Sequence, residues 1–207
     1  MIKYYTVRGD GSAELIIEKS RFIGRVRETL SRDAADRFFA EIKKTHRTAT
    51  HNVPAFVIGD SMQLQWASDD GEPQGTSGAP IVQMLTSEGI TNAAVMVTRY
   101  FGGIKLGTGG LVRAYTASAK AALDAAGIVA VKEGVAIRYE IGYPYLDKLK
   151  ALAERSGFSL GDLVYAEKAA VTVTAEKEDA QRLISAVTGL TGGTERLIYR
   201  KDCDIRT

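Results

Sequence analysis

Cysteine and histidine are almost absent from this sequence. Cys203 is the single cysteine, which excludes an internal disulfide framework and any zinc or iron–sulfur site that needs several cysteines. His46 and His51 are the only histidines. Residues at this spacing lie about 140° apart on a helix and on opposite faces of a strand, so regular structure cannot direct both at one metal ion. We expect no resident metal site.

Long hydrophobic runs and a large charge excess are also missing. The longest apolar run near the N-terminus, residues 15–17, lies between Glu14 and Glu18, so we expect neither a signal peptide nor a membrane-spanning helix. The 27 Lys and Arg exceed the 25 Asp and Glu by only 2, and bulk charge alone therefore does not indicate a strongly electropositive polymer-binding protein. The composition predicts a soluble, cytoplasmic protein without membrane contact.

Glycine is the residue that is present in excess. There are 21 glycines in 207 residues, against an average usage of roughly 7%. Nine of them fall between residues 71 and 110. Such a density is tolerated where the backbone needs a positive φ or must approach another group closely, so we expect the functional site in this stretch.

The first part of the chain, residues 1–132, mixes strands and helices. We predict strands at residues 2–7, 13–18, 22–26, 53–58, 62–67 and 93–97, and helices at 31–44, 76–88 and 111–126. The first two strands flank a turn at residues 9–11, which is typical of a hairpin. Residues 93–97 are apolar without alternation, which indicates a central strand that is covered on both faces.

The second part, residues 135–207, repeats a different order. Alternating apolar residues predict a strand at 135–141, Pro144 begins a helix, and a hairpin turns at Glu167 and Lys168. A second helix around residues 180–187 and a strand at 194–200 follow. This β-α-β-β-α-β order is the ferredoxin-like arrangement. We therefore predict an α+β protein of two domains, residues 1–132 and 135–207.

The glycine-rich segment at residues 99–113 runs from a strand end into a helix. A helix N-terminus presents unpaired N–H groups, and glycines let an anion come close to them. The spacing matches neither a Walker loop nor a dinucleotide-binding fingerprint. One interpretation is a phosphate cradle for a nucleotide or a nucleic-acid backbone; the other is a tight crossover whose glycines serve packing. The candidate phosphate-binding residues are Arg99, Gly102, Gly103, Lys105, Gly107, Thr108, Gly109, Gly110 and Arg113.

An acidic turn at residues 69–73 precedes another helix start. Its carboxylates indicate either a divalent-cation site or a solvated turn, and we favour the solvated turn because no fixed ligand spacing is present. A cation linking Asp70 to a bound phosphate is one hypothesis. No nucleophile–base pair is evident in the sequence, although folding can bring His51 close to a hydroxyl. The candidate cleft residues are His51, Asp70, Glu72, Thr76 and Ser77.

A further basic cluster lies in the third predicted strand. Arg21, Arg25 and Arg27, with Phe22 among them, form a basic–aromatic strand edge of the kind that contacts nucleic acid. A solvated strand face is the interpretation that we favour for it.

Two long stretches carry a resemblance to a known family. Residues 70–80 (DGEPQGTSGAP) and 97–115 (VTRYFGGIKLGTGGLVRAY), with the shorter 20–23 and 49–52, resemble the signature of the IMPACT family in its bacterial, YigZ-type form. The resemblance implies a first domain of the left-handed β-α-β type, as in a small-subunit ribosomal protein and domain IV of elongation factor G. It implies a small ferredoxin-like domain after it.

The resemblance supplies no catalytic residues. It implies a protein with RNA or ribosome contact that regulates translation, and this is the function we expect, with no cofactor beyond a possible divalent cation. Two alternatives stay open: an enzyme that acts on a phosphorylated small molecule or nucleotide in the same cleft, and a module that docks a protein partner. Of these, the non-enzymatic functions are favoured.

Overall fold

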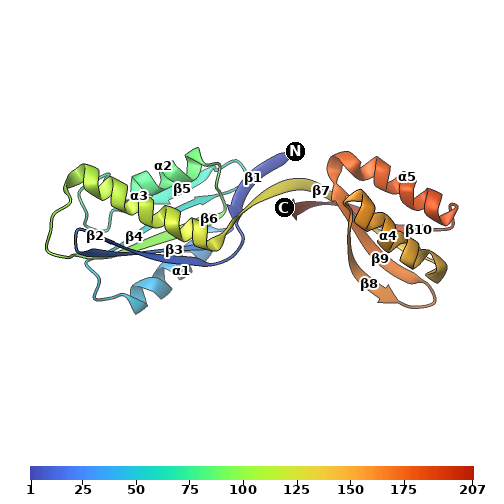
Figure 1. Ribbon diagram of the computed structural model, residues 1–207, viewed down its shortest axis with the longest axis horizontal. Helices are drawn as coiled ribbons and strands as arrows, with labels where there is room; N and C mark the ends of the chain where they lie inside the picture. Colours follow the sequence, from blue (N-terminus) through green and yellow to red (C-terminus); the bar gives the residue numbers. More distant parts are fainter. The chain divides into compact units, whose positions relative to one another are not determined.

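The computed structural model describes residues 1–207, and the chain divides into two compact units. One is Tyr4–Ala130; the other is Val131–Thr207 together with Met1–Lys3. Each contains an antiparallel sheet with helices packed against it (Figure 1). The α+β class predicted from the sequence is therefore confirmed. None of the helices combines the length and apolar character needed to cross a membrane.

The first unit is built on a sheet of five strands in the order β2-β3-β6-β4-β5. The strands are β2 (Gly11–Ile17), β3 (Ser20–Glu28), β4 (His51–Ile58), β5 (Leu64–Ala67) and β6 (Ala93–Tyr100). The central position of β6 fits the unbroken apolar run at residues 93–97, and residues 93–99 are all buried. The central strand expected there is confirmed.

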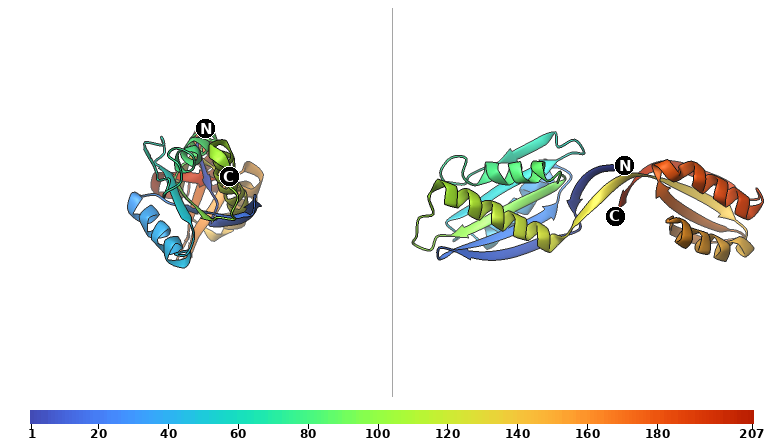
Figure 2. Two further views of the ribbon diagram at one scale, coloured as in Figure 1. Left: turned by 90° about the vertical axis from the view of Figure 1, so that its left-hand side faces the viewer. Right: turned by 45° about the horizontal axis from the view of Figure 1, so that its top comes forward.

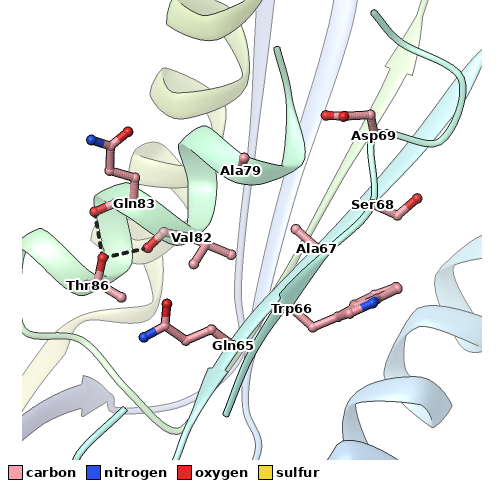
Figure 3. A pocket seen from close by; sticks show the side chains of 9 residues that line it. All are labelled: Gln65, Trp66, Ala67, Ser68, Asp69, Ala79, Val82, Gln83 and Thr86. Atoms are coloured by element: carbon pink, nitrogen blue, oxygen red, sulfur yellow. Dashed lines mark hydrogen bonds between the residues drawn. The ribbon is translucent and has the colours of Figure 1, made fainter. Parts of the chain in front are cut away.

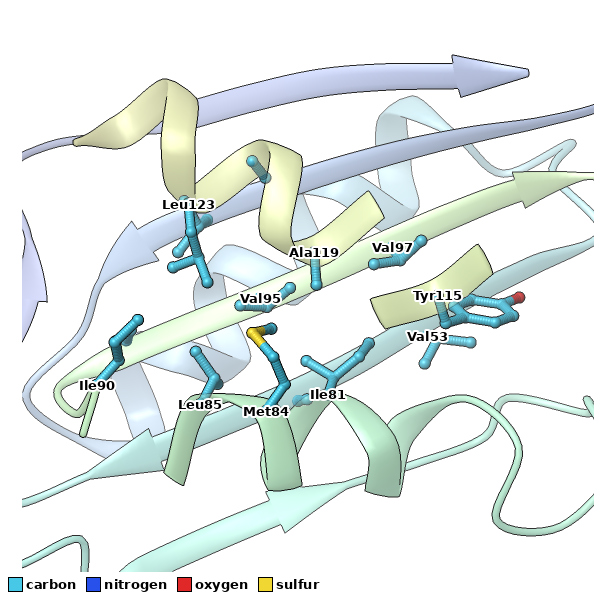
Figure 4. Close-up of a cluster of buried hydrophobic side chains, with 14 of the residues drawn as sticks. Val53, Ile81, Met84, Leu85, Ile90, Val95, Val97, Tyr115, Ala119 and Leu123 are labelled. Carbon is cyan, nitrogen blue, oxygen red and sulfur yellow. The ribbon is translucent and has the colours of Figure 1, made fainter. Parts of the chain in front are cut away.

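Helices cover both faces of this sheet. Helices α2 (Gly78–Ser87) and α3 (Gly107–Ala126) pack on one face, where they form a core with alternate residues of β4 and β6 (Figure 4). Helix α1 (Arg32–Thr45) packs on the other face and is seen apart from α2 and α3 in Figure 2. Its apolar stripe of Phe38, Phe39 and Ile42 contacts Phe56 and Trp66.

Helix α3 begins at Gly107, four residues before the start predicted from the sequence. The prediction was wrong because glycines 107, 109 and 110 have poor helix propensity. Packing further along the helix holds this turn: Leu111, Tyr115 and Leu123 are buried in the core. The helix ends as predicted at Gly127, whose φ is 73° and whose N–H donates to the Leu123 carbonyl.

Strand β1 (Ile2–Val7) does not pair with β2, so the predicted hairpin is wrong. It lies beside β7 (Ile128–Ile141) in the second sheet. That sheet continues with β8 (Ser159–Tyr165), β9 (Ala169–Glu176) and β10 (Arg196–Arg206). The path is β1-β7-β9-β8, and β10 pairs with β7.

Two helices complete the second unit. Helices α4 (Leu146–Ser156) and α5 (Ala180–Thr191) share one core with alternate residues of β7 and β9. Short 3-10 turns at Tyr143–Tyr145 and Lys177–Asp179 precede them. The predicted hairpin between β8 and β9 is present, and the element order from β7 to β10 is β-α-β-β-α-β.

Candidate functional site

A buried ion pair lies where β6 ends on the α2–α3 side of the sheet. The Arg99 Nη1 atom is 2.6 Å from the Glu72 Oε1 atom, and only 4% and 9% of these two residues are exposed. The Tyr115 hydroxyl of α3 donates to the same carboxylate oxygen at 2.7 Å. Burial, followed by the hydrogen bond to Glu72, raises the pKa of Tyr115. A glutamate from the acidic turn thus joins a strand and a helix.

His51 is the next group around this carboxylate. Its Nε2 atom is 3.7 Å from the Glu72 Oε1 atom. Its Nδ1 lies 2.8 Å from the Asp70 carbonyl oxygen, so Nδ1 carries a proton and donates it, since a carbonyl only accepts. No serine or threonine hydroxyl is bonded to His51, so the arrangement does not form a nucleophile–base pair.

The first carboxylate of the turn, Asp69, caps helix α2. Its Oδ1 accepts hydrogen bonds from the Ser77 amide at 3.1 Å, the Ser77 hydroxyl at 2.7 Å and the Gly78 amide at 2.9 Å. Its Oδ2 accepts from the Gly75 amide at 2.7 Å. Burial alone would raise the pKa of Asp69, but these hydrogen bonds outweigh it and the pKa is lowered. The solvated acidic turn that we favoured from the sequence is therefore wrong.

Replacing Asp69 by alanine is expected to lower the free energy of unfolding by about 2 kcal/mol, because the amides at the start of α2 lose their acceptor. The pKa of Asp69 is lower in the folded state, so the stabilisation is present above the unfolded value near 3.8. It is lost as pH falls through the lower folded pKa. Urea unfolding between pH 3 and pH 7 measures this, with Asp69→Asn as the control that keeps one acceptor; an equal difference at every pH contradicts it.

The remaining cleft residues serve separate partners. Asp70 accepts from the Asn52 amide at 2.6 Å and pairs with Lys43 at 3.4 Å. The Thr76 hydroxyl donates to the Pro73 carbonyl. The carboxylates of the turn therefore point to different donors, and no group of three or more acidic, His or Cys side chains is arranged for a metal ion. The geometry does not support the cation link hypothesised at Asp70.

The glycine-rich segment lines the same cavity as this ion pair, and the amides in its middle have no backbone acceptor. The amides of residues 103–106 donate to no backbone carbonyl, and no side chain caps the start of α3. The two preceding amides are bonded to side chains: the Phe101 amide donates to the Thr50 hydroxyl at 3.0 Å and the Gly102 amide donates to the Ser20 hydroxyl at 3.1 Å. The first amides of a helix lack intrahelical acceptors, so this segment presents several donors together.

A cavity of about 350 Å³ joins the segment to the ion pair. It is lined by Glu72, Pro73, Arg99, Phe101, Lys105, Leu106, Gly107, Thr108 and Leu111. Lys105 is exposed and makes no ion pair, and it also lines a second cavity of about 430 Å³ that contains Arg113. Arg113 is likewise exposed and makes no ion pair. Two free cations therefore flank the uncapped helix start.

Arg99 is not a free cation of the kind expected for a phosphate-binding residue. Its guanidinium is held by Glu72 and, at 3.3 Å, by the Ser20 hydroxyl. Its Nε atom is buried without a hydrogen-bond partner. Its guanidinium carbon is 5.5 Å from the Phe101 ring centroid, and 47% of Phe101 is exposed. Arg99 therefore forms the charged floor of the cavity, beneath an exposed aromatic ring.

Ser20, Phe101 and Tyr115 also belong to this site, although no pattern in the sequence marked them as members. Ser20 and Tyr115 lie within the family-like stretches at residues 20–23 and 97–115, but only the fold brings their hydroxyls to Arg99 and Glu72. A usable signal was present at Arg99 itself. A charged residue that closely follows a buried apolar run, such as residues 93–97, requires a buried counter-charge when it is itself buried.

Another cavity, of about 550 Å³, lies between β5 and α2 (Figure 3). It is lined by Gln65, Trp66, Ala67, Ser68, Asp69, Ala79, Val82, Gln83 and Thr86. Apart from Asp69, whose carboxylate caps α2, no side chain of the acidic turn or the glycine-rich segment reaches it. It carries no free charge and is not part of the candidate site.

Residues 18–123, which contain all parts of this site, match the Impact N-terminal domain. The chain belongs to the IMPACT family. It is 38% identical over 190 residues to the IMPACT family member YvyE of Bacillus subtilis (strain 168), with 92% of this chain and 88% of that protein covered. The resemblance seen in the sequence is confirmed.

A second IMPACT family member and a solved structure are also similar to this chain. The chain is 44% identical over 110 residues to YigZ of Escherichia coli (strain K12), which covers 52% of this chain and 53% of YigZ. A crystal structure of a hypothetical protein, 28% identical, superimposes with a TM-score of 0.60 and covers 95% of this chain and 97% of that one.

Proposed function

We propose that this IMPACT family protein binds the phosphate backbone of RNA at the start of α3 and acts on RNA or the ribosome as a regulator of translation. The observation that carries the proposal is the uncapped N-terminus of α3 beside two cations without ion pairs, Lys105 and Arg113. Free amides and unpaired cations together provide the contacts that phosphate oxygens take.

An exposed aromatic ring favours a single-stranded nucleic acid over an isolated phosphate ion. Phe101 lies on the rim of the cavity that also contains Lys105 and Thr108. Base stacking on such a ring contributes about 1–3 kcal/mol per base, and it tolerates every base. The cations then follow the backbone while the ring holds one base.

The element order supports the finer fold assignment that the family implies. In the second unit the strands lie in the order β10-β7-β9-β8 with α4 and α5 in a common core, and we assign it to the ferredoxin-like fold. We assign the first unit to the left-handed β-α-β type found in a ribosomal protein and in domain IV of elongation factor G. This kinship to translation proteins is an analogy and supports the function only as such.

Lys105→Gln is expected to weaken binding of a single-stranded RNA oligonucleotide. It should also reduce the slope of log affinity against log salt concentration by roughly one, because one phosphate contact is lost. Fluorescence anisotropy between 50 and 200 mM salt measures both quantities. Lys44→Gln, an exposed lysine on α1, is the matched control and should leave both unchanged. Wild-type affinity that stays flat across this salt range contradicts the proposal.

A small phosphorylated ligand is a second candidate, because the cavity above Arg99 and Glu72 is the size of a compact ligand. A thermal-shift screen with nucleotides and sugar phosphates separates the two functions. Stabilisation by one small molecule at micromolar concentration, without salt-dependent RNA binding, would favour an enzyme or a small-molecule sensor.

A further inference from the structure

The arginines of β3 form a second basic cluster, on the α1 side of the sheet. Arg21, Arg25 and Arg27 alternate along the strand and therefore share one face. Phe22 faces the opposite way and packs on Tyr115, with ring centroids 5.4 Å apart. Since β3 also lies between β2 and β6, the basic–aromatic strand edge considered from the sequence is wrong.

Two of these three arginines are neutralised by carboxylates. Arg21 pairs with Glu14 at 2.8 Å, and Arg27 pairs with Asp10 at 2.7 Å and Glu41 at 2.9 Å. Arg25 has no carboxylate partner, and its Nη1 atom is buried without a hydrogen bond. A buried guanidinium N–H without an acceptor is unfavourable. The chain supplies no acceptor for this atom, so an acceptor from a ligand would stabilise it.

His46, at the end of α1, presents a second atom of this kind. Its Nδ1 is 2.9 Å from the Tyr100 hydroxyl, while its Nε2 is buried without a partner. Burial, followed by the charges of Arg25 and Arg21, lowers the pKa of His46. His46 and Arg25 line the same cavity of about 270 Å³, so the two side chains that carry these unpartnered nitrogen atoms border one space.

We propose that this cavity binds a singly charged oxyanion, a carboxylate or a phosphodiester, between Arg25 Nη1 and His46 Nε2. The charge of the ligand follows from the lining, in which Arg25 and Arg27 balance Asp10 and Glu41. The Arg21–Glu14 pair and the Tyr100 phenol, which also face this region, add no net charge. Protonation of His46 adds one positive charge, which one negative charge on the ligand balances.

Binding is therefore coupled to proton uptake by His46. An anion beside the imidazole favours its charged form and raises its pKa. Between the pKa of His46 in the free protein and its raised pKa in the complex, the affinity falls by about tenfold per pH unit, because each binding event there must also protonate His46. A dianion is disfavoured by Asp10 and Glu41 in the same lining.

The two histidines make the test site-specific, because His46 faces this cavity and His51 faces Glu72 on the other side of the sheet. Imidazole NMR signals of the full chain are followed during titration with acetate, dimethyl phosphate and inorganic phosphate at pH 5.5 and 7.5. We expect saturable shifts of His46 and not of His51, a raised pKa of His46, and tighter binding at pH 5.5. Response to acetate alone or to dimethyl phosphate alone identifies which oxyanion the site takes.

Arg25→Gln is expected to weaken the His46 response at least about tenfold, since one of two charged donors is lost. Arg25→Lys keeps the charge and the aliphatic stem, and it is expected to weaken the His46 response less. It is the test variant if Arg25→Gln does not fold. Arg21→Gln, on the same strand face and paired with Glu14, is the matched control that retains saturable binding. A His46 signal that does not move, that moves equally in Arg25→Gln, or that responds best to inorganic phosphate at pH 7.5 overturns the proposal.

Discussion

Replacing Glu72 by alanine is expected to lower the free energy of unfolding by about 3–5 kcal/mol. The substitution leaves the Arg99 guanidinium buried with only the Ser20 hydroxyl as a partner, and it removes the acceptor of the Tyr115 hydroxyl. An uncompensated charge in the protein interior is far more unfavourable than the loss of the attraction within the pair.

Urea denaturation measures this loss, and a paired substitution identifies its cause. If the unpaired charge is responsible, Glu72→Met combined with Arg99→Met should recover much of the stability that Glu72→Ala loses, because both charges are then removed. A loss below about 1 kcal/mol for Glu72→Ala would contradict a buried, mutually dependent pair.

Replacing Gly24 by alanine is expected to destabilise the same unit by about 3 kcal/mol, at the upper end of overpacking substitutions. A Cβ atom on Gly24 would overlap the Ser118 carbonyl group of α3, with the carbonyl carbon only 2.9 Å away. The helix cannot move aside easily, because Gly11 of β2 meets Ala126 of α3 equally closely. The backbone of α3 thus rests directly on β2 and β3.

Thermal and urea unfolding of Gly24→Ala give the measurement, and Gly9→Ala is the control within the same unit. An added Cβ at Gly9 meets nothing within 4 Å, so this change should be neutral or slightly stabilising. Equal effects at the two positions would show that close packing against α3 is not the cause. The result also bears on the candidate site, since the Gly24 contact helps to position the helix whose first turn lines the same cavity as Lys105.

Much of the fold could be predicted because local patterns and packing agree. Helix α1 has a serine cap, charges that match its dipole and a single apolar stripe, and Ser31 does accept from the Ala34 amide. The predicted pairing of β1 was wrong because its partner strand, β7, lies more than a hundred residues away in the sequence. The predicted start of α3 was wrong because tertiary packing at Leu111 and Tyr115 overrode the low helix propensity of its glycines.

The candidate site could be located but not understood from the sequence. The glycine-rich segment and Lys105 stand out by composition, which reports on the local backbone. The roles of Asp69 and Glu72 could not be predicted from composition, because neighbouring carboxylates in a polar turn have the pattern of a solvated surface. One caps a helix and the other is buried against Arg99, a difference that depends on which way each side chain points after folding.

The placement of Trp66 gives the protein a built-in optical probe. It is the only tryptophan of the chain, and its indole lies beside Phe39 and Phe56 in the Tyr4–Ala130 unit. Its fluorescence emission therefore follows denaturation of that unit alone, whereas a dye attached to Cys203 on β10 reports on the other. Comparing the two signals in one sample shows whether the halves of the molecule melt together or in succession.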